Sequence, residues 1–194
     1  MRSSFLAALL LAAATLTGCA SKKADFYTLS AEAPADSARP VATFNVVVGA
    51  ATVPELIDRP QIVVRDGANQ VDIDEFARWA EPLKSQIPRV IAADLARLLN
   101  SQRVSAYPVA GDAASAYRVR ANVERFDAQP GEAVMVDVTW TVSPPGKGAQ
   151  IFGRSTVHEP VTGTGYGPLV IAWSRAIGTV SRDIAAAIQP ASAP

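Results

Sequence analysis

Three stretches in the second half of the chain place apolar and polar side chains in alternation. Apolar residues occupy every second position in residues 117–123 and 134–142, and residues 151–157 form a third strand-like run. A period of two puts successive side chains on opposite faces of a strand. The connections at 127–131 and 143–148 are short and rich in turn-forming residues, so the pattern predicts an antiparallel meander of three strands.

Shorter runs of β-forming residues occur in the first half of the chain. Residues 26–29 and 44–48 each predict one short strand. Residues 62–65 and 70–73 are separated by Asp-Gly-Ala-Asn, in which Gly and Asn accept the left-handed backbone angles of a tight turn. This second pair of runs therefore predicts a β-hairpin.

Two other stretches repeat apolar residues at intervals of three and four, which is the spacing of an amphipathic helix. The first covers residues 85–100, with Ser85 as its N-cap, Pro88 in its first turn and Asn100 at its end. The second covers residues 168–188. The apolar stripes consist of Ile87, Val90, Ile91, Leu95, Leu98 and Leu99 in the first helix and Val170, Trp173, Ile177, Val180, Ile184 and Ile188 in the second. The charged residues off these stripes are Arg89, Asp94, Arg97, Arg175, Arg182 and Asp183.

The order of the predicted elements is strands, helix, strands, helix. This order predicts a single domain of the α/β or α+β class, with a mixed, largely antiparallel sheet and two main amphipathic helices packed on it. No internal repeat is visible.

The N-terminal segment is predicted to be an export signal and no part of the fold. Residues 5–16 form an uncharged apolar run of twelve residues behind Arg2, whereas a membrane-spanning helix needs about 20. The run ends in Leu-Thr-Gly-Cys, which resembles the cleavage box of bacterial lipoproteins, and its Cys19 is the only cysteine of the chain. We therefore expect cleavage before Cys19 and attachment of fatty acyl chains, such as palmitate, to this residue.

These features divide the chain into three parts. Residues 1–18 are the lipoprotein signal peptide, residues 19–41 contain the lipidated cysteine, a tether and the first short strand, and residues 42–190 form the folded domain. Two or more acyl chains hold a protein stably on a bilayer. Ala20 and Ser21 follow the cysteine in place of the Asp that retains enteric lipoproteins at the inner membrane. We therefore expect anchoring to the outer membrane, facing the periplasm.

Composition excludes several classes of function. Eighteen basic and 18 acidic residues give no net charge, which disfavours nucleic-acid binding. One cysteine and one histidine provide neither a disulfide nor a zinc ligand set nor a Cys/His catalytic pair. We therefore predict no metal and no cofactor.

Two clusters could in principle bind small ions. Asp72 and Asp74 share one strand face and lie beside Glu75, which would suit a cation, although charged residues at a hairpin end are more often solvated. The glycine-rich residues 163–167 precede a helix and could hold a phosphate, but they lack the strand context and the lysine of nucleotide-binding motifs. We interpret the first cluster as a solvated edge and the second as a loop.

A hydrolase would require Ser155 or His158. Neighbouring residues on a strand point to opposite faces, so Glu159 cannot complete a local triad with His158, and no Gly-x-Ser-x-Gly elbow is present. We therefore predict no catalytic residue and a protein that is not an enzyme.

Several motifs together resemble the auxiliary lipoprotein family of ABC-type transport, the family of paraquat-inducible protein C. The resemblance covers nearly all of the mature chain. It rests on the runs at residues 53–65, 76–83, 107–109, 117–119 and 125–127, with residues 26–29 similar to the opening aromatic strand of the family.

The resemblance implies an accessory subunit of a lipid-trafficking system that is anchored in the outer membrane. Its partner would be an envelope-spanning protein with MCE (mammalian cell entry) domains, and its role would be docking. The candidate partner-binding residues are Arg59, Gln61, Arg65, Arg78 and Trp79. Trp79 has a second interpretation, as an aromatic cover for the sheet edge.

An alternative function is a periplasmic lipid carrier with an apolar cavity between sheet and helices. The same valine and isoleucine residues would serve either a packed core or the lining of such a cavity. Whether the domain works as a monomer or a homo-oligomer is left open.

Overall fold

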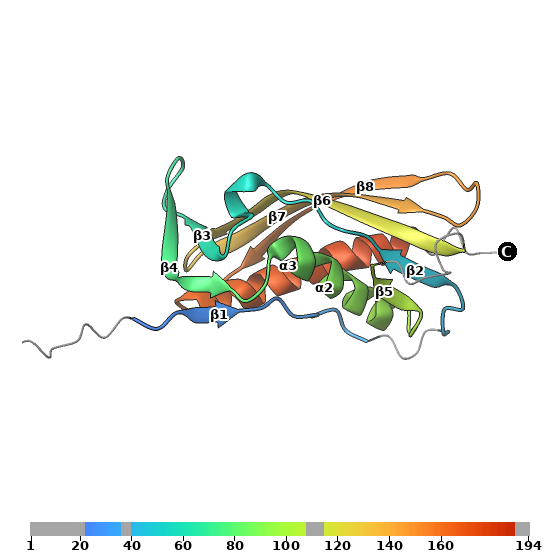
Figure 1. The fold of residues 1–194 in the computed structure, drawn as a ribbon, viewed down its shortest axis with the longest axis horizontal. Helices are drawn as coiled ribbons and strands as arrows, with labels where there is room; N and C mark the ends of the chain where they lie inside the picture. Colours follow the sequence, from blue (N-terminus) through green and yellow to red (C-terminus); the bar gives the residue numbers. More distant parts are fainter. Residues whose placement is uncertain (1–21, 36–39, 108–114, 189–194) are drawn as a thin grey trace, which may run out of the picture.

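Two β-sheets and two long helices form one α/β body, which confirms the predicted fold class (Figure 1). This computed structural model describes residues 22–35, 40–107 and 115–188, so the signal peptide and Cys19 lie outside the described residues. The elements, in chain order, are β1 (Asp25–Tyr27), β2 (Asn45–Val48), the 3-10 helix η1 (Glu55–Ile57), β3 (Gln61–Arg65), β4 (Val71–Trp79), α2 (Leu83–Leu98), β5 (Val104–Ala106), β6 (Ala116–Gln129), β7 (Ala133–Ser143), β8 (Ile151–Pro160) and α3 (Tyr166–Ile188).

The larger sheet has five strands in the order β5-β2-β6-β7-β8. Its last three strands pair antiparallel, which confirms the predicted meander. Strand β2 pairs parallel with both β5 and β6. Strand β5 was not predicted, because three residues are too few to show a period of two.

The smaller sheet has the order β1-β4-β3 and contains the predicted hairpin. Strand β1 pairs parallel with the last three residues of β4, and a bulge interrupts the hairpin between Gln61 and Ile62. Strand β4 continues to Trp79, beyond the predicted end at residue 73. Trp79 therefore belongs to a strand and not to a connection between the hairpin and the helix, because pairing with β1 extends the strand.

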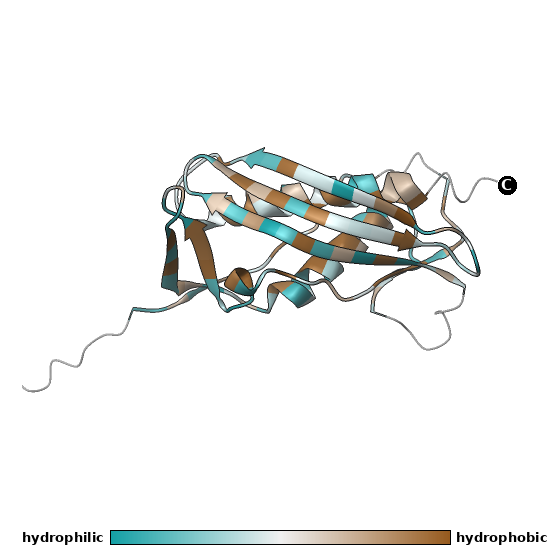
Figure 2. Ribbon diagram, turned by 90° about the horizontal axis from the view of Figure 1, so that it is seen from above, coloured by the Kyte–Doolittle hydropathy of each residue, from teal (hydrophilic) through white to brown (hydrophobic). Residues whose placement is uncertain are grey.

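Helices α2 and α3 cover one face of the five-stranded sheet (Figure 1). All members of the apolar stripe predicted for the second helix are buried in α3. On the other face of the meander, none of the described residues forms a covering helix, and hydrophilic and hydrophobic positions alternate along the strands (Figure 2). Among the helices that the structure describes, none is long and apolar enough to cross a membrane.

The start of α2 differs from the prediction. The helix begins at Leu83, and the backbone N–H groups of Ser85 and Gln86 both donate to the carbonyl of Pro82, so Ser85 is not the N-cap. Pro88 therefore lies beyond the first turn, where its missing N–H removes one helical hydrogen bond. The predicted end is close to the observed one, because α2 ends at Leu98 and Asn100 has a φ of 45°.

A cluster of three aromatic rings joins the two sheets and α3. Phe126 of β6 stacks on Trp173 of α3 with a centroid distance of 4.9 Å and an interplanar angle of 5°. Trp79 of β4 lies 5.5 Å from Trp173 and 6.4 Å from Phe126, and all three side chains are buried. The smaller sheet is thus fixed to the larger one through these rings.

Replacing Phe126 by Ala is expected to lower the free energy of unfolding by about 3–5 kcal/mol, because it leaves a cavity between the two tryptophans. The matched control is Phe152→Ala, at a side chain that is 72% exposed. The control is expected to change stability by no more than about 0.5 kcal/mol. Denaturant unfolding measures both, and equal losses would contradict a structural role for the ring cluster.

Candidate functional site

A small pocket lies where β3 begins, β4 ends and α2 begins. It has a volume of about 260 Å³ and is lined by Asp58, Arg59, Pro60, Trp79, Ala80, Glu81, Pro82 and Lys84. The backbone N–H of Trp79 donates to the carbonyl of Pro60 at 2.7 Å, which ties the two walls together. Two prolines with fixed φ make this pocket, named here the proline notch, a rigid surface feature.

The charged residues around the proline notch are paired except for one. Lys84 lies 3.2 Å from the carboxylate of Asp58, and Arg89 lies 2.5 Å from that of Glu81. Arg59 is exposed and makes no ion pair or hydrogen bond within the described part of the chain. Its guanidinium is therefore available to an acidic group from outside.

Two other predicted partner-binding residues lie on the outer face of the smaller sheet. Gln61 and Arg78 are opposite each other across β3 and β4. The Gln61 amide donates to Glu75 Oε2 at 2.9 Å, and Arg78 Nη2 lies 4.0 Å from the same oxygen. Trp79 points to the other face and is only 5% exposed, so it supports the sheet from within and contributes little area to the lining of the proline notch.

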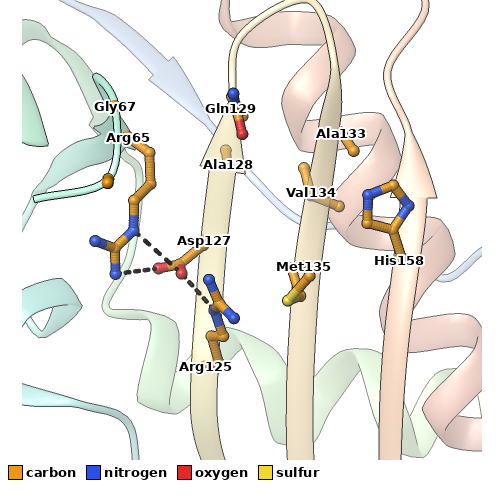
Figure 3. A pocket seen from close by; sticks show the side chains of 11 residues that line it. Arg65, Gly67, Arg125, Asp127, Ala128, Gln129, Ala133, Val134, Met135 and His158 are labelled. Carbon is orange, nitrogen blue, oxygen red and sulfur yellow. Dashed lines mark hydrogen bonds and ion pairs between the residues drawn. The ribbon is translucent and has the colours of Figure 1, made fainter.

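Arg65 lies in a separate pocket of about 510 Å³ between the hairpin and the β6–β7 turn (Figure 3). Its Nε is 3.2 Å from Asp127 Oδ2, and Arg125 Nε lies 2.5 Å from the same oxygen. One carboxylate thus balances two guanidinium groups. Arg65 and Arg59 border different pockets, so the predicted residues do not form a single surface.

Ser155 and His158 do not form a catalytic pair. The Ser155 hydroxyl is buried, accepts a hydrogen bond from Trp140 Nε1 at 3.0 Å and donates one to Asp183 Oδ2 at 2.6 Å. His158 is exposed and lies three positions along the strand, on the opposite face. Glu159 is paired with Arg175 at 2.6 Å.

The two clusters that were considered for ion binding lie in strand β4 and in the loop before α3. Asp74 accepts the backbone N–H of Phe76 at 2.7 Å, and the described residues contain no group of three or more His, Cys, Asp or Glu placed to hold a metal. Gly163 and Gly165 have φ values of 112° and 83°, as expected for a loop that turns into α3. Burial, reinforced by the nearby Asp74 and Asp72, raises the pKa of Tyr166 at the start of α3 to about 12.

Buried polar side chains hold residues 29–33 against the two helices, a feature that the sequence analysis missed. We name residues 29–33 the N-terminal strap. Gln86 Oε1 of α2 accepts the backbone N–H of Leu29 at 2.8 Å, and Ser174 Oγ of α3 accepts that of Ser30 at 3.1 Å. The strap is therefore fixed by hydrogen bonds to both helices.

Asp94 makes a third contact with the N-terminal strap. It lies off the apolar stripe of its helix, yet it is completely buried, because α3 and the strap cover that side of α2. Its carboxylate accepts the backbone N–H of Ala33 at 2.9 Å and the hydroxyl of Ser181 at 3.2 Å. Burial raises the pKa of Asp94, although these hydrogen bonds oppose the shift. The signal available in the sequence was Asp94 itself, an acidic residue between the apolar positions Ile91 and Leu95 of the helix.

Comparisons with known proteins identify a family. The model of the ABC-type transport auxiliary lipoprotein component family matches residues 27–185. None of the curated proteins compared with the chain is significantly similar to it.

Two solved structures share the fold. The crystal structure of an uncharacterized protein has a TM-score of 0.72 and 20% identity, and the match covers 87% of this chain and 100% of that one. A Xanthomonas campestris protein of the DUF330 family has a TM-score of 0.68 and 18% identity, with 84% and 93% covered. At these identities the likeness establishes the fold alone.

The buried Asp94 generates a prediction about pH. The unfolding free energy of the wild type is expected to fall as the pH rises through the raised pKa of Asp94, because the unfolded chain loses this proton at an ordinary pKa of about 3.9. Asp94→Asn does not titrate, so its stability should improve relative to the wild type as the pH rises. Denaturant unfolding from about pH 4 to about pH 8 measures this difference, and parallel profiles would contradict the assignment.

Proposed function

Because this chain belongs to the family of ABC-type transport auxiliary lipoprotein components, we propose that it is a non-catalytic subunit that docks an envelope-spanning MCE-domain protein at the outer membrane. The observation that carries the proposal is the extent of the family match, which runs from β1 to the last turn of α3. The partner and the membrane follow from the family resemblance and from the sequence around Cys19.

Lipid attachment at Cys19 supplies the anchor in this proposal. Cys19 is only six residues before the first strand, so the folded body remains close to the bilayer that holds the acyl chains. Ala20 and Ser21 favour the outer membrane. A body held at one membrane is suited to receive a protein that arrives from the other.

The proline notch is the surface that we assign to the partner. Its walls are held by Pro60 and Pro82, so little conformational entropy is lost on binding. Among the described residues, Arg59 has no ion-pair or hydrogen-bond partner, and arginine is enriched among residues that dominate interface energies. We expect a carboxylate of the MCE-domain protein opposite Arg59. Arg65 is a weaker candidate for contact with the partner, because its guanidinium is already paired with Asp127.

Gentle solubilisation of the full-length lipoprotein from its own envelope tests the proposal. Mass spectrometry then identifies every protein and lipid that is recovered with it. An MCE-domain protein in stoichiometric amount is the expected result. Bound phospholipid without a protein partner would overturn the docking role in favour of the lipid carrier.

Arg59→Glu is expected to weaken binding of the partner at least about tenfold, which corresponds to about 1.4 kcal/mol. The variant should shift the melting temperature by no more than about 2 °C, because Arg59 is exposed and makes no hydrogen bond or ion pair with any residue that the structure describes. Lys147→Glu is the matched control, since it reverses an exposed charge in the β7–β8 turn. If Arg59→Glu and Lys147→Glu bind the partner equally well, Arg59 is not part of the interface.

Cys19→Ala tests the anchor when residues 1–18 are replaced by an ordinary cleavable export signal. The folded body should then leave the membrane fraction and appear in the soluble periplasmic fraction, because stable anchoring to the bilayer depends on the acyl chains. The wild type should band with the outer membrane on a density gradient. A Cys19→Ala chain that still sediments with membranes would contradict the anchoring.

A further inference from the structure

The outer face of the smaller sheet combines exposed and half-buried aromatic and basic side chains next to the predicted anchor. Phe26 of β1 lies opposite Arg78 of β4, and Phe76 lies two residues before Arg78, so all three side chains share one face. Phe26 is 64% exposed. The alternate residues Ala77 and Trp79 are buried on the other face.

Lysine residues extend this face toward the N-terminus. Lys22 Nζ lies 4.7 Å from the centroid of the Phe76 ring, and Lys23 is exposed. We name Lys22, Lys23, Phe26, Phe76 and Arg78 together the juxtamembrane face. The carboxylates near it include those of Asp25, Asp74 and Glu75. Asp74 accepts the backbone N–H of Phe76 at 2.7 Å, and Glu75 is shared between Arg78 and Gln61.

The length of the chain before this face limits its distance from the acyl chains. Cys19 is three residues from Lys22 and seven from Phe26. A fully extended chain spans at most about 3.5 Å per residue, so Lys22 lies within about 10 Å of the lipidated residue and Phe26 within about 25 Å. Residues from β1 onward cannot detach to lengthen this segment, because β1 pairs with β4 and the N-terminal strap is hydrogen-bonded to the helices.

We propose that the juxtamembrane face rests on the bilayer that holds the acyl chains, with Phe26 in the interfacial region and the basic side chains against anionic lipid headgroups. This inference rests on the proposed lipid anchor at Cys19. Aromatic rings favour the interface between headgroups and acyl chains, and basic residues close to a membrane are attracted to anionic lipids. The contact would orient the domain, because the face belongs to a sheet that is fixed to the core by Trp79.

Site-directed labelling can measure this contact in the lipidated, full-length protein. Cys19 is the only cysteine and carries the lipid, so one introduced cysteine can receive a nitroxide label without competition. The labelled variants are Phe26→Cys and the matched control Phe152→Cys, which replaces an exposed phenylalanine on β8. The probe is a vesicle of phosphatidylethanolamine and phosphatidylglycerol, and the readout is accessibility of the label to oxygen and to a water-soluble nickel chelate.

The label at position 26 is expected to be at least about threefold less accessible to the nickel chelate than the label at position 152, since a polar, water-soluble chelate does not enter the apolar part of the bilayer readily. A third label at the exposed Thr28 leaves Phe26 in place. Combining Thr28→Cys with Lys22→Glu and Lys23→Glu should restore nickel accessibility. Circular dichroism checks that each variant is folded.

The outcomes separate this inference from the proposed function. If the protein floats with the vesicles but the labels at positions 26 and 28 are as accessible as the control, the juxtamembrane contact is overturned and the anchor stands. If the protein does not float, the anchor fails and the contact fails with it. If the labels stay protected from the nickel chelate in vesicles without phosphatidylglycerol and in the lysine variants, the proposed contact between the basic side chains and anionic headgroups is overturned.

Discussion

The stacking of Phe126 on Trp173, with Trp79 packed against both rings, is the contact on which the rest of the molecule depends. The three rings come from β6, α3 and β4, so they connect the five-stranded sheet, the helical layer and the three-stranded sheet. Aromatic pairs combine a large buried area with a preferred geometry. The smaller sheet contains the first strand, most of the juxtamembrane face and one wall of the proline notch. The ring cluster therefore fixes the position of all three relative to the core.

A second constraint is polar and fixes the N-terminal strap. Gln86, Asp94 and Ser174 bind three backbone N–H groups of residues that follow β1. A buried carboxylate is costly unless it is fully hydrogen-bonded, so such a group specifies one position of the strap and disfavours others. The consequence is that the segment after β1 is tied through its backbone to both helices.

Together these constraints suit a docking subunit. In the proposed arrangement, the anchor and the juxtamembrane face hold one side of the smaller sheet at the membrane. The proline notch and Arg59 lie next to this face, where β4 ends and α2 begins, and are the surface assigned to the protein partner. The domain would then act as a rigid support whose surfaces for lipid and protein are built on the same three strands.

The sequence alone determined the features that depend on short-range order. The period of two gave the meander, the period of 3.6 gave both helices, and the segment that ends at Cys19 indicated export and lipidation, because each signal is contained in a few consecutive residues. The division of the strands into two sheets, the burial of Asp94 and Trp79, and the separation of Arg65 from Arg59 were decided only by the tertiary structure. Each of these depends on which distant segment covers a given side chain, and strand pairing and burial are set by contacts between residues far apart in the chain.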